Sequence, residues 1–160
     1  MTEKEKFCHN IKEHQASMYA LAYSIVRNED DAADVISESI CRAYGSTALL
    51  KNEGAFKAWI LRIVHNTAIE MIRKNSKFVE LDTLYDVAEK SDGVDIATKM
   101  TLHDAVESLN EPYRTVVNLF YYENLSVSII AQITGTSPAA VRQQLSRARK
   151  MLKKLLNEDF

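Results

Sequence analysis

Four polar side chains near the C-terminus have the types and the spacing of a surface that forms hydrogen bonds with the edges of DNA bases. They stand at positions i, i+1, i+4 and i+5, which share one face of an α-helix. Arginine, glutamine and serine can all hydrogen-bond to base edges in the major groove, which is wide enough to admit a helix. The set comprises Arg142, Gln143, Ser146 and Arg147.

The stretch around these four residues is basic. No acidic side chain occurs between Glu123 and Glu158. Lysine and arginine on the same helix suit phosphate oxygens, which fix the register of a protein on DNA without reading its sequence. We therefore expect DNA as the partner, and the alternative is a solvated basic helix at the end of a bundle. The further basic residues are Arg149, Lys150, Lys153 and Lys154.

Helix start and stop signals predict a helix-turn-helix at about 126–145. Ser126 suits the N-cap of a short helix, and Gly135 suits the left-handed residue that ends it. Ser137 followed by Pro138 is an N-cap followed by a proline at the first helical position. The basic residues would then lie on the second helix of the pair.

A second basic helix is predicted from Phe56 to Lys77. Its apolar residues follow helical spacing, as in Phe56, Ile60 and Val64. The other face carries an asparagine among basic side chains, which could follow a DNA backbone. These residues are Arg62, His65, Asn66, Arg73, Lys74 and Lys77.

The rest of the chain also has helical patterns. Helices are expected over about 7–26, over about 30–44 with an Asn or Asp cap near Asn28, and on both sides of Pro112. Glycine and proline are scarce, with 4 and 2 residues among 160. The predicted fold class is all-α.

Charge and composition divide the chain into two small helical domains and a linker. The net charge of the whole chain is −2. Residues 78–98 hold six acidic side chains and one lysine, and Gly93 follows Ser91 and Asp92 in a break signal. We therefore expect a first domain at 1–77, an acidic linker at 78–98 and a second domain at 99–160.

Several classes of protein are disfavoured. No apolar run approaches the roughly 20 residues that cross a bilayer, and the charged N-terminus does not have the pattern of a signal peptide, so a cytoplasmic location is expected. Walker, dinucleotide-binding and HExxH motifs are absent from the sequence, so no enzyme activity, cofactor or metal is expected. His103-Asp104 alone is weak support for a metal-dependent hydrolase. Cys8 and Cys41 are expected to be small buried side chains.

Three segments resemble the extracytoplasmic-function (ECF) group of sigma factors, in the sigma-70 family. YALAYSIVRNEDDAADVISESICRAY resembles regions 2.1–2.2, and FKAWILRIVHNTAIEMIRK resembles regions 2.3–2.4. LNEPYRTVVNLFYYENLSVSIIAQITGTSPAAVRQQLSRARKML resembles region 4. A helix-turn-helix alone occurs in many regulators, whereas the three segments in this order are specific to the family.

The resemblance implies a role for the helix over about 30–44. It would bind the β′ clamp of bacterial core RNA polymerase, and acidic side chains there would suit a basic partner surface. The implied polymerase-facing residues are Asp31, Asp34, Val35, Ser37 and Glu38.

The resemblance also divides a promoter between the two basic helices. The helix from Phe56 would take the −10 element as melted strand, where Asn66 matches the family position that engages a base turned out of the stack. Six residues would read or hold the −35 element as duplex, namely Arg142, Gln143, Ser146, Arg147, Arg149 and Lys150.

The expected partners are therefore core RNA polymerase, through its β′ clamp and β flap, promoter DNA and an anti-sigma factor, with no direct insertion into a membrane. Two other functions are compatible with a helix-turn-helix. One is a stand-alone regulator that binds duplex DNA as a dimer. The other is an adaptor whose basic helix meets an acidic protein.

Overall fold

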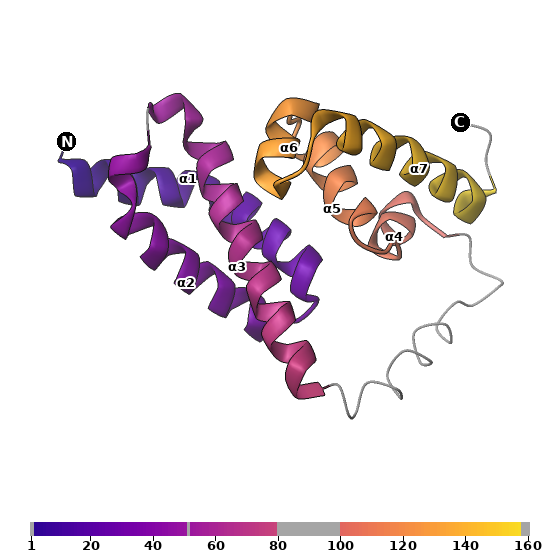
Figure 1. The fold of residues 1–160 in the computed structure, drawn as a ribbon, viewed down its shortest axis with the longest axis horizontal. Helices are drawn as coiled ribbons and strands as arrows, with labels where there is room; N and C mark the ends of the chain where they lie inside the picture. The colour runs from indigo at the N-terminus through magenta and orange to yellow at the C-terminus, as the bar shows by residue number, and fades with distance from the viewer. Residues whose placement is uncertain (1, 51, 80–99, 158–160) are drawn as a thin grey trace.

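The protein is described by a computed structural model that covers residues 2–50, 52–79 and 100–157, without the side chains of 53 and 77–79. Within these ranges the secondary structure is helical throughout, so the predicted all-α class is confirmed. Figure 1 shows two groups of helices side by side, one formed by the N-terminal part of the chain and one by the C-terminal part. The predicted linker lies outside the described residues from 80 onward.

Three helices form the first domain: α1 (Glu3–Val26), α2 (Glu29–Gly45) and α3 (Phe56–Val79). Each packs against the other two. The core between them is apolar and dry, with Met18, Ala32 and Ile60 fully buried. Helix α3 runs to Val79, two residues beyond the predicted end of the domain.

Local signals set the ends of these helices. The Asn28 side chain accepts a hydrogen bond of 2.9 Å from the backbone N–H of Asp31, which confirms the expected cap of α2. Two short 3-10 turns, η1 (Thr47–Leu49) and η2 (Glu53–Ala55), connect α2 to α3.

The second domain consists of α4 (Leu102–Glu107), α5 (Tyr113–Val117), the π-helical turn η4 (Asn118–Tyr122), α6 (Val127–Thr134) and α7 (Pro138–Leu156). Helix α7 packs on α4, α5 and α6. Its apolar side chains point into this core, where Val141 and Ala148 are fully buried. The long basic helix is thereby held on one face by three neighbours.

The helix-turn-helix signals are confirmed. The Ser126 hydroxyl caps α6 through the N–H of Ile129, and Gly135 has the left-handed φ of 71° that ends this helix. The Ser137 hydroxyl accepts a hydrogen bond of 3.1 Å from Ala140 N–H at the start of α7. Pro138 is the first residue of α7, where a missing N–H costs nothing.

The two domains touch each other. Helix α6 of the second domain packs on α3 of the first, and α5 packs on α1. The sequence indicated two modules and a linker, but it contained no sign that the modules would be in contact. This contact brings the second basic helix of the first domain beside the helix-turn-helix of the second (Figure 1).

Some burial predictions were wrong. Cys8 and Cys41 are exposed rather than buried. Tyr44 was placed on the apolar face of its helix, yet 55% of its surface is exposed. Tyr121, expected in the core, is 49% exposed, because the helical turn ends at η4 and leaves its ring at the surface.

We expect Ser137→Ala to lower the free energy of unfolding by about 1 kcal/mol, because the N–H of Ala140 loses its acceptor. Urea unfolding followed by circular dichroism measures this change. Ser146→Ala is the matched control, because Ser146 lies exposed in the interior of the same helix, where alanine is favourable. Equal destabilisation by both substitutions would contradict the capping role.

Candidate nucleic-acid interface

Helix α3 has a buried face and a polar face. Ile60, Leu61 and Val64 have no exposed surface, which fixes the rotation of the helix. Because buried and exposed positions alternate with the helical period, the predicted DNA-binding side chains Arg62 and Asn66 are directed to solvent. Arg73 and Lys74 are also exposed, and the Lys77 side chain is outside the described residues. The structure therefore places four of the six predicted residues on the surface of α3.

His65 differs from this group, since it is largely buried. Its Nδ1 atom is buried without a hydrogen-bond partner among the described residues. Burial lowers the pKa of His65, and the side chain of Asn66 opposes this shift in part. The expectation that His65 follows the DNA backbone was wrong in this conformation, because a neutral buried ring offers a phosphate neither charge nor access.

Helix α7 presents the predicted base-reading residues together. Arg142, Gln143, Ser146 and Arg147 are exposed. The positions between them face the core, and Val141 and Leu145 are buried. The helix therefore cannot rotate without exposing its apolar side, so the four polar side chains keep a common direction. Such a face has the donors that base edges accept.

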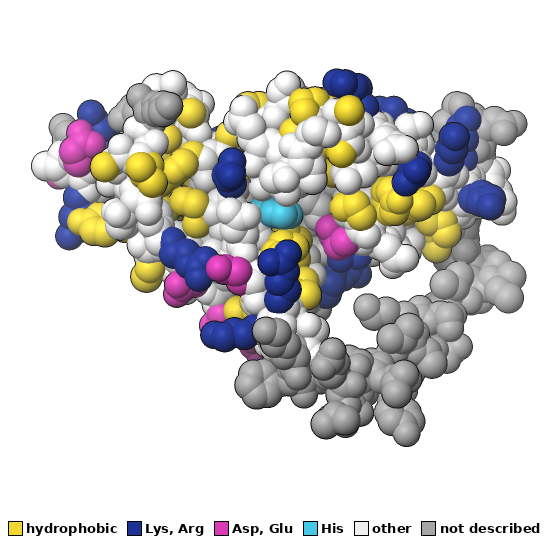
Figure 2. Space-filling model, viewed as in Figure 1, with side chains coloured by type: hydrophobic (Ala, Val, Ile, Leu, Met, Phe, Trp, Pro, Cys, Tyr) yellow, Lys and Arg dark blue, Asp and Glu magenta, His cyan; other side chains and the backbone are white. Residues whose placement is uncertain are grey.

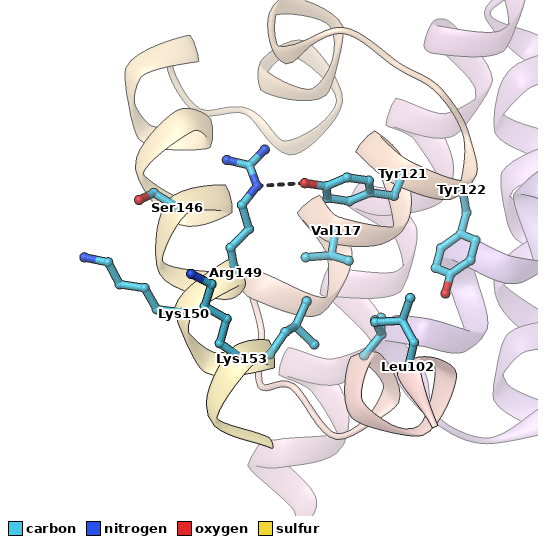
Figure 3. A pocket seen from close by; sticks show the side chains of 10 residues that line it. Leu102, Val117, Tyr121, Tyr122, Ser146, Arg149, Lys150 and Lys153 are labelled. Atoms are coloured by element: carbon cyan, nitrogen blue, oxygen red, sulfur yellow. Dashed lines mark hydrogen bonds between the residues drawn. The ribbon is translucent and has the colours of Figure 1, made fainter. Parts of the chain in front are cut away.

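Arg149 points into its own domain. Its Nε donates a hydrogen bond of 2.7 Å to the Tyr121 hydroxyl (Figure 3). The guanidinium also lies 6.0 Å from the centre of the Phe120 ring and 5.8 Å from that of Tyr121. The sequence predicted a DNA contact for Arg149, and in this conformation the side chain is instead engaged with α5–η4. Lys150 remains exposed.

An apolar groove of about 610 Å³ lies beside Arg149. Its walls come from α4, α5–η4 and the C-terminal half of α7. Figure 2 shows hydrophobic side chains gathered there with Lys and Arg side chains beside them, and Figure 3 shows Lys150 and Lys153 projecting on the α7 side. The apolar lining residues are Leu102, Val106, Val117, Tyr121, Tyr122 and Leu152. The sequence analysis missed this groove, because its walls come from segments far apart in the chain.

The exposed face of α2 is acidic. Asp34, Ser37 and Glu38 are exposed, and Asp31 is half-buried in the first turn of the helix. Val35 was predicted to face a partner, and this is a correction: it has no exposed surface, because it lies one turn from Ala32 on the side that packs in the core.

Arg42 joins this acidic face to α3, a contact that sequence reasoning missed. Its guanidinium hydrogen-bonds to Glu38 on its own helix at 3.1 Å, and it bonds to Thr67 at 3.3 Å and to Glu70 on α3. The i, i+4 spacing of Glu38 and Arg42 could have suggested the first contact. The contacts to α3 have no local signal in the sequence.

Two further classes of site were tested. Among the described residues, no group of three or more His, Cys, Asp or Glu side chains could hold a metal ion. No described helix is both long enough and apolar enough to cross a membrane.

Comparisons with known proteins match both domains. The family model for sigma-70 region 2 matches residues 11–78, and that for sigma-70 region 4 matches residues 99–152. RNA polymerase sigma factor SigV of Bacillus subtilis is 36% identical over 94% of this chain and 91% of its own length. The chain belongs to the sigma-70 family of RNA polymerase sigma factors. The family is that of a transcription initiation factor, and the sequence resemblance to the ECF group is confirmed.

Other sigma factors align along most of this chain. ECF sigma factor SigW of Bacillus subtilis is 26% identical over 98% of the chain and 91% of its own length. The solved structure of the sigma factor RpoE in complex with the anti-sigma factor NepR, from Bartonella quintana, has a TM-score of 0.77, with 21% identity over 98% of this chain and 99% of that chain. CnrH, solved with the cytosolic domain of CnrY, has a TM-score of 0.69, with 22% identity over 99% and 92%. These two structures show the fold.

His65 predicts part of the pH dependence of stability. Its pKa is lower in the folded protein than in the unfolded chain, so its contribution is present above about pH 6.5 and is lost as the pH falls below that value. We expect His65→Phe to reduce the loss of unfolding free energy between pH 7.5 and pH 5.5, measured by urea unfolding.

The comparison of the two proteins also removes an opposing effect. Burial raises the pKa of Glu111, which favours the folded state as the pH falls, and this contribution is common to both proteins. An unchanged pH dependence in His65→Phe would contradict the role of the histidine.

Proposed function

We propose that this sigma factor binds core RNA polymerase and directs transcription initiation by recognising the −35 element as duplex and the −10 element as melted strand. The observation that carries the proposal is the pair of polar helix faces, on α3 and α7, that belong to separate domains of one chain. A regulator that reads only duplex DNA needs the second of these faces and leaves the first unexplained.

The proposed −10 surface is the exposed face of α3. Asn66 is exposed near the middle of this helix, and its amide can pair with the edge of a base that has left the duplex. Arg62 and Arg73 lie about one and two turns away and can neutralise phosphates of the same strand. This arrangement suits a single strand that runs along the helix.

The proposed −35 surface is the N-terminal half of α7. Arg142 and Gln143 lie in its first two turns, the part of a recognition helix that enters the major groove first. Arg147 lies one turn further along, and Lys150 can meet phosphate.

Two surfaces suit the polymerase. The acidic side chains Asp34 and Glu38 on α2 fit a basic partner such as the β′ clamp. The groove next to α7 is apolar with a basic rim, which suits an amphipathic helix with acidic residues, and we assign it to the β flap.

An anti-sigma factor is the proposed regulator. The support is the likeness in fold to RpoE and CnrH, which were solved in complex with NepR and with the cytosolic domain of CnrY. A protein that covers α2 or the apolar groove would compete with polymerase for the same side chains.

The proposal is tested by adding the purified chain to bacterial core polymerase and a promoter library in run-off transcription. We expect abundant transcripts whose promoters share −10 and −35 elements. The absence of transcripts, together with tight dimeric binding to a palindromic duplex by the chain alone, would contradict the proposal and favour a stand-alone regulator.

Asn66→Ala is expected to alter the preference for bases in the −10 element and to leave the affinity for core polymerase unchanged. The reason is that Asn66 is exposed on α3, away from the acidic face of α2. Run-off transcription from promoters with each −10 base changed measures the preference. Asn75→Ala, at another exposed asparagine of α3, is the control and should behave as wild type. Loss of core binding in Asn66→Ala would assign Asn66 a different role.

Arg142→Ala is expected to weaken the use of the preferred −35 sequence by about 1–3 kcal/mol and to relax specificity at one base pair, because a bidentate contact to a guanine is lost. Competition between promoters with and without the −35 element measures this in the presence of core polymerase. Lys154→Ala should weaken binding equally at both promoters, because phosphate contacts carry no sequence information. An unchanged −35 dependence in Arg142→Ala would contradict the assignment.

A further inference from the structure

The contact between the two domains contains charged side chains that join segments far apart in the chain. Arg27, at the end of α1, forms a salt bridge of 2.7 Å with Glu107 of α4. Glu123, which follows η4, accepts a hydrogen bond of 2.6 Å from Ser17 of α1 and forms a salt bridge of 3.2 Å with Lys57 of α3. Each of these contacts crosses from one domain to the other.

A buried arginine adds a fourth connection. Arg114 of α5 is only 9% exposed, and its Nε donates a hydrogen bond of 2.7 Å to the backbone carbonyl of Ser24 in α1. Its other donors bond to the Leu109 carbonyl at 2.6 Å and to the Glu111 carboxylate at 3.3 Å. The guanidinium is therefore satisfied only while α1 lies against the second domain.

The closed arrangement does not fit the spacing of a promoter. The elements at −10 and −35 are about 25 base pairs apart, which is about 85 Å along B-form DNA. Because α3 touches α6, and α6 leads directly into α7, the two DNA-reading helices are held close together. A compact chain of 160 residues is about 40 Å across.

The length of chain between the domains removes this conflict when the contact opens. The segment between α3 and α4 covers residues 80–101. A chain of that length reaches about 70 Å when fully extended. Domains that have separated can therefore meet both elements.

We propose that Arg27–Glu107, the Glu123 contacts to Ser17 and Lys57, and the Arg114–Ser24 bond form a latch that holds the free chain closed, and that the latch opens when the chain takes a promoter. The second half of this proposal rests on the proposed function. The latch itself depends only on the contacts between the domains.

The ionic part of the latch is weak enough to be reversible. The side chains of Arg27 and Glu107 are 37% and 28% exposed, and those of Lys57 and Glu123 are 32% and 17% exposed. A pair that is partly exposed shifts an equilibrium by about two- to fivefold and is screened by salt. Higher ionic strength therefore favours the open chain.

Charge reversal tests the latch in the free full-length chain. Arg27→Glu and Glu107→Arg each place like charges together, and the double variant restores a pair of opposite charges. Small-angle X-ray scattering gives the radius of gyration at low and high salt. We expect each single variant to be expanded at low salt, the double variant to return toward wild type, and wild type to expand as salt rises. Lys12→Glu, at an exposed position of α1, is the control and should stay compact.

Circular dichroism separates opening from unfolding, since opening keeps the helical signal. Equal radii for wild type and both single variants, or a double variant as expanded as the singles, would overturn the latch. Affinity for core polymerase tests the second half: Arg27→Glu should bind about two- to fivefold more tightly, because the closed fraction no longer competes. Expansion of Arg27→Glu with no gain in affinity would overturn the requirement for opening. Expansion of this variant when neither wild type nor variant binds core would contradict the proposed function and leave the latch standing.

Discussion

Helix α3 carries the constraint on which the rest of the structure depends. It must bury one side against α1, α2 and α6 while its other side stays polar and exposed. Leu61 and Val64 have no exposed surface, and Asn66 lies in solvent one turn further along. Burying a large aliphatic side chain contributes roughly 1.5–3 kcal/mol, so several such positions fix the rotation of the helix. The proposed contact with melted DNA exists only because this rotation is fixed.

Helix α7 solves a similar problem with three kinds of surface on one helix. Val141, Leu145 and Ala148 bury its inner side, and Arg142 and Gln143 lie on its outer side near the N-terminus. The C-terminal half borders the apolar groove, where Arg149 is engaged with Tyr121. Duplex DNA and a protein helix could thus occupy neighbouring parts of the same element, which would connect the two kinds of binding.

The features that the sequence predicted are local. Asn28, Ser126, Gly135 and Ser137 mark helix ends because a cap needs only a few neighbouring residues, and the structure has all four in those roles. The polar face of α7 also followed from helical periodicity. Val35 illustrates the limit of such reasoning: the same periodicity places it on the buried side of α2, whereas the resemblance placed it among exposed contacts.

The remaining features depend on tertiary packing. Ser17 and Glu123 are 106 positions apart, and Arg27 and Glu107 are 80 apart, so no local pattern links them. The burial of His65 likewise depends on its neighbours in the fold and not on its own helix. The central claim is that the chain divides a promoter between opened and paired DNA while bound to polymerase. Footprinting of the holoenzyme on a promoter tests it most directly, with permanganate to detect unpaired thymines and nuclease to detect covered duplex. We predict unpaired bases at −10 and a protected duplex at −35, both only when core polymerase is present. Protection of a palindromic duplex by the chain alone, with no unpaired bases after core is added, would contradict the account.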